Sequence, residues 1–182
     1  MTLRHLLPLL ALAAAGPLAA ADRALVLDPA QSTLDIVVKA TVDSFTGRLA
    51  AYDFAGTVDE QGRITAANFA FHFRDVLTGK PKRDKAMHEW QHTDRFPDGS
   101  FSLASLETEG DVTRAFGRLT LHGVTREVNF PVTVTHSGAT YAIEGDAPVD
   151  TREFGLPVIR LLGLLKVDPV VHVKFHFQGK AA

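Results

Sequence analysis

Two alternating segments that meet at a glycine turn constrain the fold more than any other part of this sequence. In FGRLTLHGVTREVNFPVTV, Leu119 and Leu121 alternate with polar residues before Gly123, and valine or phenylalanine alternates with polar residues across 128–134. Strand side chains point to opposite faces in turn, so the segment predicts a half-buried antiparallel hairpin. Glycine suits the tight turn. The apolar face must then be covered by a second sheet, a closed barrel or an apolar ligand.

The first 21 residues have the pattern of a secretory signal peptide. Arg4 precedes an apolar run over residues 6–18, and small residues lead up to an expected cleavage after Ala21. The alternative is a membrane anchor, but the run is short for a span and contains two prolines. We therefore expect residues 1–21 to be removed and residues 22–182 to form the mature domain. The periplasm is the expected location, with secretion outside the cell as the alternative.

Composition narrows the classes of function. Removal of the predicted signal leaves roughly 160 residues, the usual size of one domain. The signal carries one Lys/Arg and no acid, so the mature charge is 18 − 21 = −3, which does not support nucleic-acid binding. The absence of cysteine excludes thiol catalysis, disulfides and thiolate metal sites. No other run of apolar residues in the sequence could cross a membrane, so stable membrane insertion is not expected.

The remaining chain has the pattern of an all-β protein. Strands are expected over residues 34–42, 47–58, 64–73, 100–106, 141–149 and 167–177, besides the hairpin. Residues 74–98 are polar and predict a long loop with a short helix at 85–92. Residues 151–166 predict a short helix or loop. About eight strands with short turns favour a single antiparallel barrel over a sandwich, because closure removes exposed edges.

An ordered set of motifs resembles the YceI-like family of secreted lipocalin-like barrels. The matching pieces are Asp28 with Ser32, Gly47, Arg83-Asp84, Phe96-Pro97, Phe101-x-Leu103-x-Ser105, Gly117-x-Leu119-Thr120-x-His122-Gly123-Val124-Thr125, Arg152-x-Phe154-Gly155, and the closing segment 167–177. The resemblance implies a lipocalin-like barrel that encloses a long isoprenoid or similar amphiphilic chain, with no agreed chemistry. The family's apolar loop is replaced here by residues 86–95, AMHEWQHTDR, a departure that bears on the cavity mouth.

We therefore predict non-catalytic binding of an isoprenoid such as a polyprenol or quinone. The predicted lining comes from the more apolar face of each strand: Ile36, Val38, Phe69, Phe71, Phe73, Leu119, Leu121, Phe130, Val132, Val173 and Phe175. The predicted mouth residues are Arg83, Trp90, Phe96, Arg152 and Phe154, with Trp90 as a hydrophobic lid. An interior filled by its own phenylalanines is the alternative, in which case the barrel would be structural and bind a protein on its outer surface.

A short histidine motif supplies a different hypothesis. His88-Glu89-x-x-His92 matches the HExxH pattern, in which two imidazoles on one helical face hold zinc and the glutamate activates water. The predicted helix is short and no third ligand is evident, so metal binding of zinc or copper without peptidase activity is the more plausible form. Five other histidines are candidates to join the site: His72, His122, His136, His172 and His176.

Simpler roles are expected for several of these polar residues. His172 and His176 alternate with Lys174, which places them on the outer face of the last strand. His122 is expected to serve turn geometry. The charged segments Arg83-Asp84 and 150–153 could orient a lipid head group, since arginine binds phosphate in a bidentate manner, or could pair with each other.

Overall fold

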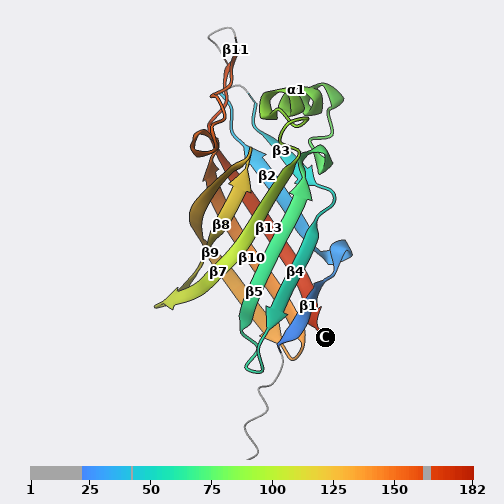
Figure 1. Cartoon of the computed structure of the whole chain (residues 1–182), viewed down its shortest axis with the longest axis vertical. Helices are drawn as coiled ribbons and strands as arrows, with labels where there is room; N and C mark the ends of the chain where they lie inside the picture. Colours follow the sequence, from blue (N-terminus) through green and yellow to red (C-terminus); the bar gives the residue numbers. More distant parts are fainter. Residues whose placement is uncertain (1–21, 42, 162–164) are drawn as a thin grey trace, which may run out of the picture.

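The computed structural model describes residues 22–41, 43–161 and 165–182. The predicted signal peptide, residues 1–21, lies outside the described residues. Figure 1 shows an elongated barrel of strands with one α-helix at its upper end and the C-terminus at its lower end. We call these the helix end and the terminal end. The prediction of an all-β antiparallel barrel is confirmed.

Eight antiparallel strands form the closed wall. They are β1 (Arg23–Leu27), β4 (Asp53–Val58), β5 (Ile64–His72), β7 (Asp98–Glu109), β8 (Val112–Leu121), β9 (Val124–Ser137), β10 (Thr140–Asp150) and β13 (Val170–Ala181). Each pairs with the next in this order, and β13 returns to β1 through Leu25 opposite Ala181. Every strand of the ring has a partner on both sides, although β9 and β10 pair only from Ser137 opposite Thr140 to Val132 opposite Gly145.

Three further strands lengthen the wall toward the helix end: β2 (Thr33–Val38), β3 (Phe45–Leu49) and β6 (Val76–Leu77). The 3-10 turn η1 (Pro29–Gln31) separates β1 from β2, and Asp28 caps it by accepting a hydrogen bond from the Ala30 amide. The neighbouring strand breaks between Leu49 and Asp53. The prediction of a single strand over 47–58 is therefore wrong. The break between β3 and β4 lies beside the break between their pairing partners, β2 and β1.

The helix α1 (Pro81–Gln91) lies in the predicted polar loop, starting four residues earlier than expected. Proline has no amide N–H, and the first residue of a helix does not need one for the helical hydrogen bonds, so Pro81 suits the start of α1. A 3-10 turn η2 (Phe73–Asp75) connects β5 to β6, and η3 (Thr151–Phe154) follows β10. The segment predicted as helix or loop also contains a small hairpin, β11 (Arg160–Leu161) and β12 (Leu165–Lys166), which sequence reasoning missed. Among the described helices, none is long and apolar enough to cross a bilayer.

The central hairpin is confirmed as β8 and β9, with Leu121 opposite Val124. His122 and Gly123 have φ values of 50° and 73°, the left-handed pair that a two-residue type I′ turn requires. The predicted role of His122 in turn geometry is thus confirmed.

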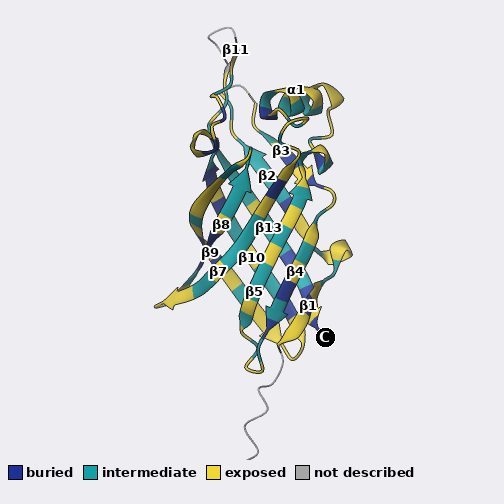
Figure 2. Ribbon diagram, in the orientation of Figure 1, coloured by how far each residue is buried: buried dark blue, intermediate teal, exposed yellow. Residues whose placement is uncertain are grey.

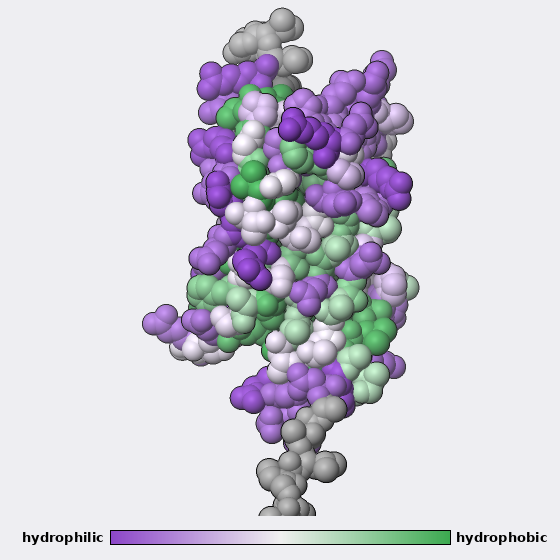
Figure 3. Space-filling view, viewed as in Figure 1, coloured by the Kyte–Doolittle hydropathy of each residue, from purple (hydrophilic) through white to green (hydrophobic). Residues whose placement is uncertain are grey.

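The terminal end is tightly packed. Leu25, Val58, Tyr141 and Ala181 form one buried cluster there, with Val58 at 0% and Tyr141 at 1% exposure. Two other clusters line the barrel farther along, one around Leu34, Leu49, Val76 and Phe177, and one around Ala115, Phe130, Val132 and Ala147. In Figure 2 much of the strand length is coloured intermediate rather than buried. Figure 3 shows hydrophilic residues gathered at both ends of the same face, with more apolar residues between them.

Candidate functional site

Most of the predicted lining residues lie on the inner face of the barrel, and Phe73 lies in the turn η2 after β5. Five of them pack against the cluster around Leu34: Ile36, Phe69, Phe71, Val173 and Phe175. Phe130 and Val132 belong to the third cluster, and Val38 alternates in register with Ile36 along β2. Phe73 contacts Phe71, Leu119 lies opposite Phe101, and Leu121 lies near Phe71 above Gly99. That any of these residues contacts a ligand stays a prediction.

Most of these inward side chains are half-buried although they point into the barrel. Phe69, Phe71, Leu119, Val173 and Phe175 all fall in this class. A side chain inside a solid core would lose its contact with solvent-sized space, since protein interiors are close-packed. Their residual exposure means that solvent-sized space reaches part of each of these side chains.

Aromatic rings contact one another along the interior. Tyr52 stacks on Phe69 with ring centroids 4.8 Å apart, and Phe175 stacks on Phe177 at 5.2 Å. Phe130 meets Phe175 edge to face at 5.9 Å. These separations are typical of favourable aromatic pairs. The rings therefore support each other around the wall and form a continuous apolar lining.

Four inward phenylalanines lie over glycines of the wall. A Cβ atom built on Gly117 would come within 2.5 Å of the Phe101 ring, and one built on Gly56 within 2.6 Å of the Phe54 ring. Gly99 and Gly145 are covered in the same way by the rings of Phe71 and Phe175, their direct cross-strand partners. We call these four contacts the wall pairs: Phe54–Gly56, Phe71–Gly99, Phe101–Gly117 and Phe175–Gly145.

The wall pairs explain how phenylalanine can line a barrel without filling it. Glycine has no side chain, so a neighbouring ring can approach its backbone closely. A ring that occupies the position of a Cβ atom leans along the wall instead of reaching toward the axis. The arrangement keeps the apolar surface of these rings against the wall of the barrel.

Sequence reasoning missed part of this lining. Tyr52, Phe54, Leu103, Ile143 and Phe177 also pack in the interior clusters. Phe101 was missed as well. The alternation of Phe101 and Leu103 with polar or small residues in the sequence could have identified both as lining residues. The role of the glycines in the other three wall pairs had no such signal, since those pairings depend on strand register, whereas Phe54 and Gly56 lie two residues apart on β4.

The helix α1 covers one end of the interior. Met87 packs on the interior cluster that contains Leu34, and the Trp90 indole N–H donates to the Pro157 carbonyl at 2.8 Å. The Arg83 guanidinium lies 4.2 Å from the centre of the Phe45 ring on β3. Contacts to β3 and to the segment after η3 hold the helix across this end, and the position of Trp90 at the mouth of a ligand site stays a prediction. Its role as a lid stays a prediction.

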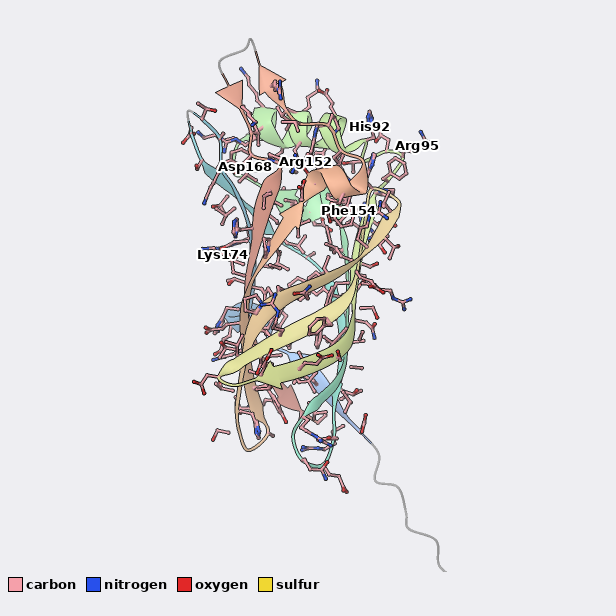
Figure 4. All side chains as sticks on the ribbon, turned by 90° about the vertical axis from the view of Figure 1, so that its left-hand side faces the viewer. His92, Arg95, Arg152, Phe154, Asp168 and Lys174 are labelled. Atoms are coloured by element: carbon pink, nitrogen blue, oxygen red, sulfur yellow. The ribbon has the colours of Figure 1, made fainter. Side chains whose placement is uncertain are left out.

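The β8–β9 turn also contacts η3 and Phe96 at the helix end. The His122 ring lies 4.1 Å from the Phe96 ring, and its Nδ1 is 3.0 Å from the Phe154 carbonyl oxygen. Phe154 is 1% exposed, so it anchors η3 rather than standing free at the mouth. Figure 4 shows Phe154, Arg152 and His92 at this same end. His122 therefore joins the turn to η3 in addition to shaping the turn.

The two predicted head-group arginines are already paired. Arg152 makes short contacts to the Asp150 carboxylate, the closest at 2.5 Å, and this hydrogen-bonded pairing lowers the pKa of Asp150 and raises the pKa of Arg152. Arg83 lies 3.7 Å from Asp43. Asp84 instead accepts hydrogen bonds from Thr78. Among the described residues, no ion pair joins the two charged segments, since Arg83 pairs with Asp43 and Arg152 with Asp150.

Three interior or mouth residues carry buried polar atoms. Burial raises the pKa of the Tyr52 phenol, against a smaller lowering by the Ser32 hydroxyl. Gln91, at the end of α1, is 1% exposed, and neither atom of its amide has a hydrogen-bond partner among the described residues. The same holds for His122 Nε2. Sequence reasoning did not single out Gln91, because a glutamine in a charged loop is expected to be exposed.

The C-terminus of α1 falls within the histidine motif, before His92. His88 lies on α1 with its Nδ1 3.2 Å from the Thr93 hydroxyl, while His92 follows the last helical residue and has a φ of 53°. Glu89 is exposed, 3.7 Å from Lys85. Within residues 22–41, 43–161 and 165–182, no three His, Asp or Glu side chains gather in a possible metal-binding group. Metal binding at this motif stays a prediction.

The outer face carries histidine–carboxylate pairs across neighbouring strands. His172 and His176 on β13 contact Asp146 and Glu144 on β10, each at 2.8 Å, so their predicted outward orientation is confirmed. His72 makes a similar contact with Asp98. These pairs lie outside the apolar interior, and each is at least partly exposed, so they belong to the wall's surface rather than to the interior site.

The fold and interior together define a closed, lipocalin-like antiparallel barrel with an apolar lining and a helix across one end. A family model described as the YceI-like domain matches residues 25–179. The chain belongs to the YceI-like family. Protein YceI from Salmonella arizonae and from Salmonella newport are each 30% identical to it over 95 residues, 50% of this chain and 50% of each relative. The chain thus spans about half the length of the curated relatives it matches.

Solved structures share the fold at lower identity. BcnA from Burkholderia cenocepacia is 21% identical with a TM-score of 0.74, and the match covers 84% of this chain and 99% of that one. A polyisoprenoid-binding domain from Saccharophagus degradans, implicated in plant cell wall breakdown, is 19% identical with a TM-score of 0.68. That match covers 89% of this chain and 100% of the domain.

Proposed function

We propose that this protein binds a long isoprenoid or similar amphiphilic lipid inside its barrel, without chemical turnover, in the periplasm. The observation that carries the proposal is the set of wall pairs, in which phenylalanine rings lean on glycines while the inward side chains remain half-buried. This combination supports an apolar interior with unfilled space. The polyisoprenoid-binding domain of Saccharophagus degradans, which shares the fold, adds support for the ligand class.

The energy of such binding would come from apolar contact. Burying ~400 Å² of lipid surface at about 25 cal/mol per Å² gives roughly 10 kcal/mol before the costs of ordering the chain and the protein. An isoprenoid is long, thin and branched by methyl groups, so it can fill a narrow interior lined by rings and branched aliphatic residues.

The direct test is extraction of the full protein purified from its native host, followed by mass spectrometry of the extract. A stoichiometric isoprenoid or comparable lipid is the expected result. Protein that yields no lipid and has no affinity for added polyprenol would overturn the proposal.

A matched pair of variants ties the binding to the interior. Gly145→Val places a side chain where the Phe175 ring lies, so the ring must move toward the barrel axis. We expect at least a tenfold loss of polyprenol affinity with the strand content retained in circular dichroism. Ala70→Val adds methyl groups at an exposed position of β5 and is the control that should bind normally. Equal affinity in both variants would argue against an interior ligand.

A further inference from the structure

The short hairpin β11–β12 does not belong to the sheet that forms the barrel. Its two strands make a sheet of their own, in which Arg160 pairs with Lys166 and Leu161 with Leu165. Figure 1 shows the hairpin projecting past α1 at the helix end. The sequence from Arg160 to Lys166 reads RLLGLLK, an apolar run with a cation on each side. Residues 162–164 lie outside the described residues, and no surface is defined from them.

Exposed cations surround the base of this hairpin. The Thr41 amide donates to the Lys166 carbonyl oxygen at 3.0 Å, so the segment after β2 lies beside β12. The Asp168 amide in turn donates to the Lys39 carbonyl oxygen at 2.8 Å. Lys39, Arg160 and Lys166 are all exposed, and across the described ranges none of the three forms an ion pair. Three positive charges therefore face solvent where the hairpin leaves the barrel.

The helix α1 adds further cations to the same end. Arg83 lies 3.7 Å from Asp43 in the segment after β2, and the Trp90 indole donates to the segment that leads into β11. Lys80 and Lys82, at the start of α1, are exposed and have no ion pair within the part of the chain that the structure describes. We call the following five residues the basic rim: Lys39, Lys80, Lys82, Arg160 and Lys166.

The carboxylates at this end do not cancel the charge of the basic rim. The exposed acids Asp43, Glu89 and Asp168 each lie beside a cation that is not part of the rim. Asp94 and Glu153 are exposed without such a partner among the described residues, against the five cations of the rim. The whole chain has a net charge of −2, so the positive charge is a local property of the helix end.

An anionic bilayer surface fits both features of this end. Lysines and arginines in clusters of about four to eight attract peripheral proteins to anionic lipid. Apolar residues beside such cations can enter the boundary between head groups and acyl chains. An acidic protein would satisfy the cations but would leave the apolar sequence between Arg160 and Lys166 without a matching partner.

We propose that the basic rim, together with strands β11 and β12, binds the surface of an anionic membrane. The contact is reversible and peripheral, and it turns the helix end of the barrel toward the lipid. This inference goes beyond the proposed function, because it concerns the outer surface and holds whether or not the barrel contains a ligand.

The test measures sedimentation of the protein, purified from its native host, with two kinds of vesicle. One kind is phosphatidylcholine alone, and the other is an equal mixture of phosphatidylcholine and phosphatidylglycerol. We expect at least roughly tenfold tighter binding to the mixed vesicles, and a loss of this preference at high salt, which screens exposed charges.

A triple variant removes the cations at the hairpin base. Lys39→Gln/Arg160→Gln/Lys166→Gln should bind the mixed vesicles roughly a hundredfold more weakly, since each lysine or arginine near an anionic surface contributes about a factor of five. Circular dichroism should show unchanged strand content, because all three side chains are exposed.

The matched control removes the same charge from the terminal end. Arg23→Gln/Arg63→Gln/Lys180→Gln changes three exposed cations there and should alter binding by less than about twofold, since these positions lie beyond the range of screened attraction. Both triple variants keep the same first 21 residues, so any contribution from that segment is equal in the two proteins.

A second pair of variants tests the apolar part of the contact. Leu161→Ser/Leu165→Ser should weaken binding to the mixed vesicles at least roughly tenfold, because two leucines no longer leave water. Val26→Ser/Val112→Ser is the control, since these side chains are 59% and 50% exposed and lie on β1 and β8. It should bind as the wild type does.

The outcomes decide the proposal without reference to the barrel interior. Equal losses in the two triple variants would show a general attraction of charge, and the membrane-docking proposal would be wrong. Equal binding to both kinds of vesicle would also overturn it. Binding to neither would overturn it and would leave the basic rim to an acidic protein. Lipid extraction tests the proposed function separately, so either proposal can fail while the other stands.

Discussion

The terminal end and the middle of the barrel use the same kind of residue in different ways. At the terminal end, Tyr141 and Val58 are almost completely buried, and the Tyr141 hydroxyl donates to the Gly62 carbonyl at 3.1 Å. In the middle, Phe69 and Phe175 face inward yet stay half-buried, and rings lie over glycines. The contrast indicates that the terminal end is buried more completely than the middle of the barrel.

The largest expected effect tests that contrast directly. Tyr141→Ala should reduce the free energy of unfolding by about 4 kcal/mol, the usual cost of deleting a buried aromatic side chain. Phe69→Ala should cost only about 2 kcal/mol, because less of its surface leaves solvent on folding. Urea unfolding followed by circular dichroism measures both. Equal losses would mean that the middle is packed as tightly as the terminal end.

A smaller effect is expected when a wall pair is disturbed. Gly99→Ala adds a methyl group where the Phe71 ring lies, and Leu121 is 3.1 Å from the same point. Overpacking of this kind costs about 1–3 kcal/mol of unfolding free energy. In a Phe71→Leu background the cost should shrink, so a double-mutant cycle gives a coupling energy for the pair. A coupling near zero would show that the ring does not depend on the glycine.

The attachment of α1 should have a still smaller effect. Trp90→Phe keeps an aromatic ring but removes the hydrogen bond to the Pro157 carbonyl. We expect a loss of about 1 kcal/mol in the free energy of unfolding. Trp90 is the one tryptophan in the sequence, so its fluorescence in the wild type also reports lipid binding at the helix end. An emission spectrum that does not change when lipid binds would show that Trp90 does not contact the ligand.

The smallest effect concerns the paired charges at the mouth. The Arg152 hydrogen bonds lower the pKa of Asp150, so this pair stabilises the folded state fully above the unfolded aspartate pKa of about 3.9 and loses that contribution as pH falls through the folded value. Asp150→Asn should remove this acid-range dependence and flatten stability between about pH 5 and the folded pKa. Because the Arg152 side chain is more than half exposed, the change in unfolding free energy should be small. An unchanged pH profile would contradict the assignment.

Local patterns predicted most of the strands and one turn. The alternation across 116–134 predicted the β8–β9 hairpin because strand periodicity and a glycine turn are local properties. The outward positions of His172 and His176 followed from the same periodicity. The short hairpin β11–β12 and the break between β3 and β4 were missed. The break depends on a neighbouring strand whose position the sequence pattern does not specify, and β11 and β12, at two residues each, are too short to show a period-two pattern.

The sequence by itself determined an all-β chain with an apolar strand face, no thiol chemistry and a weakly acidic charge, because composition and period-two alternation need no knowledge of distant contacts. Only the tertiary structure decided that Phe71, Phe101 and Phe175 lean on glycines of other strands and that Gln91 is buried at the end of α1. These features arise from cross-strand register and helix docking. They join residues far apart in the chain, and no local pattern carries that information.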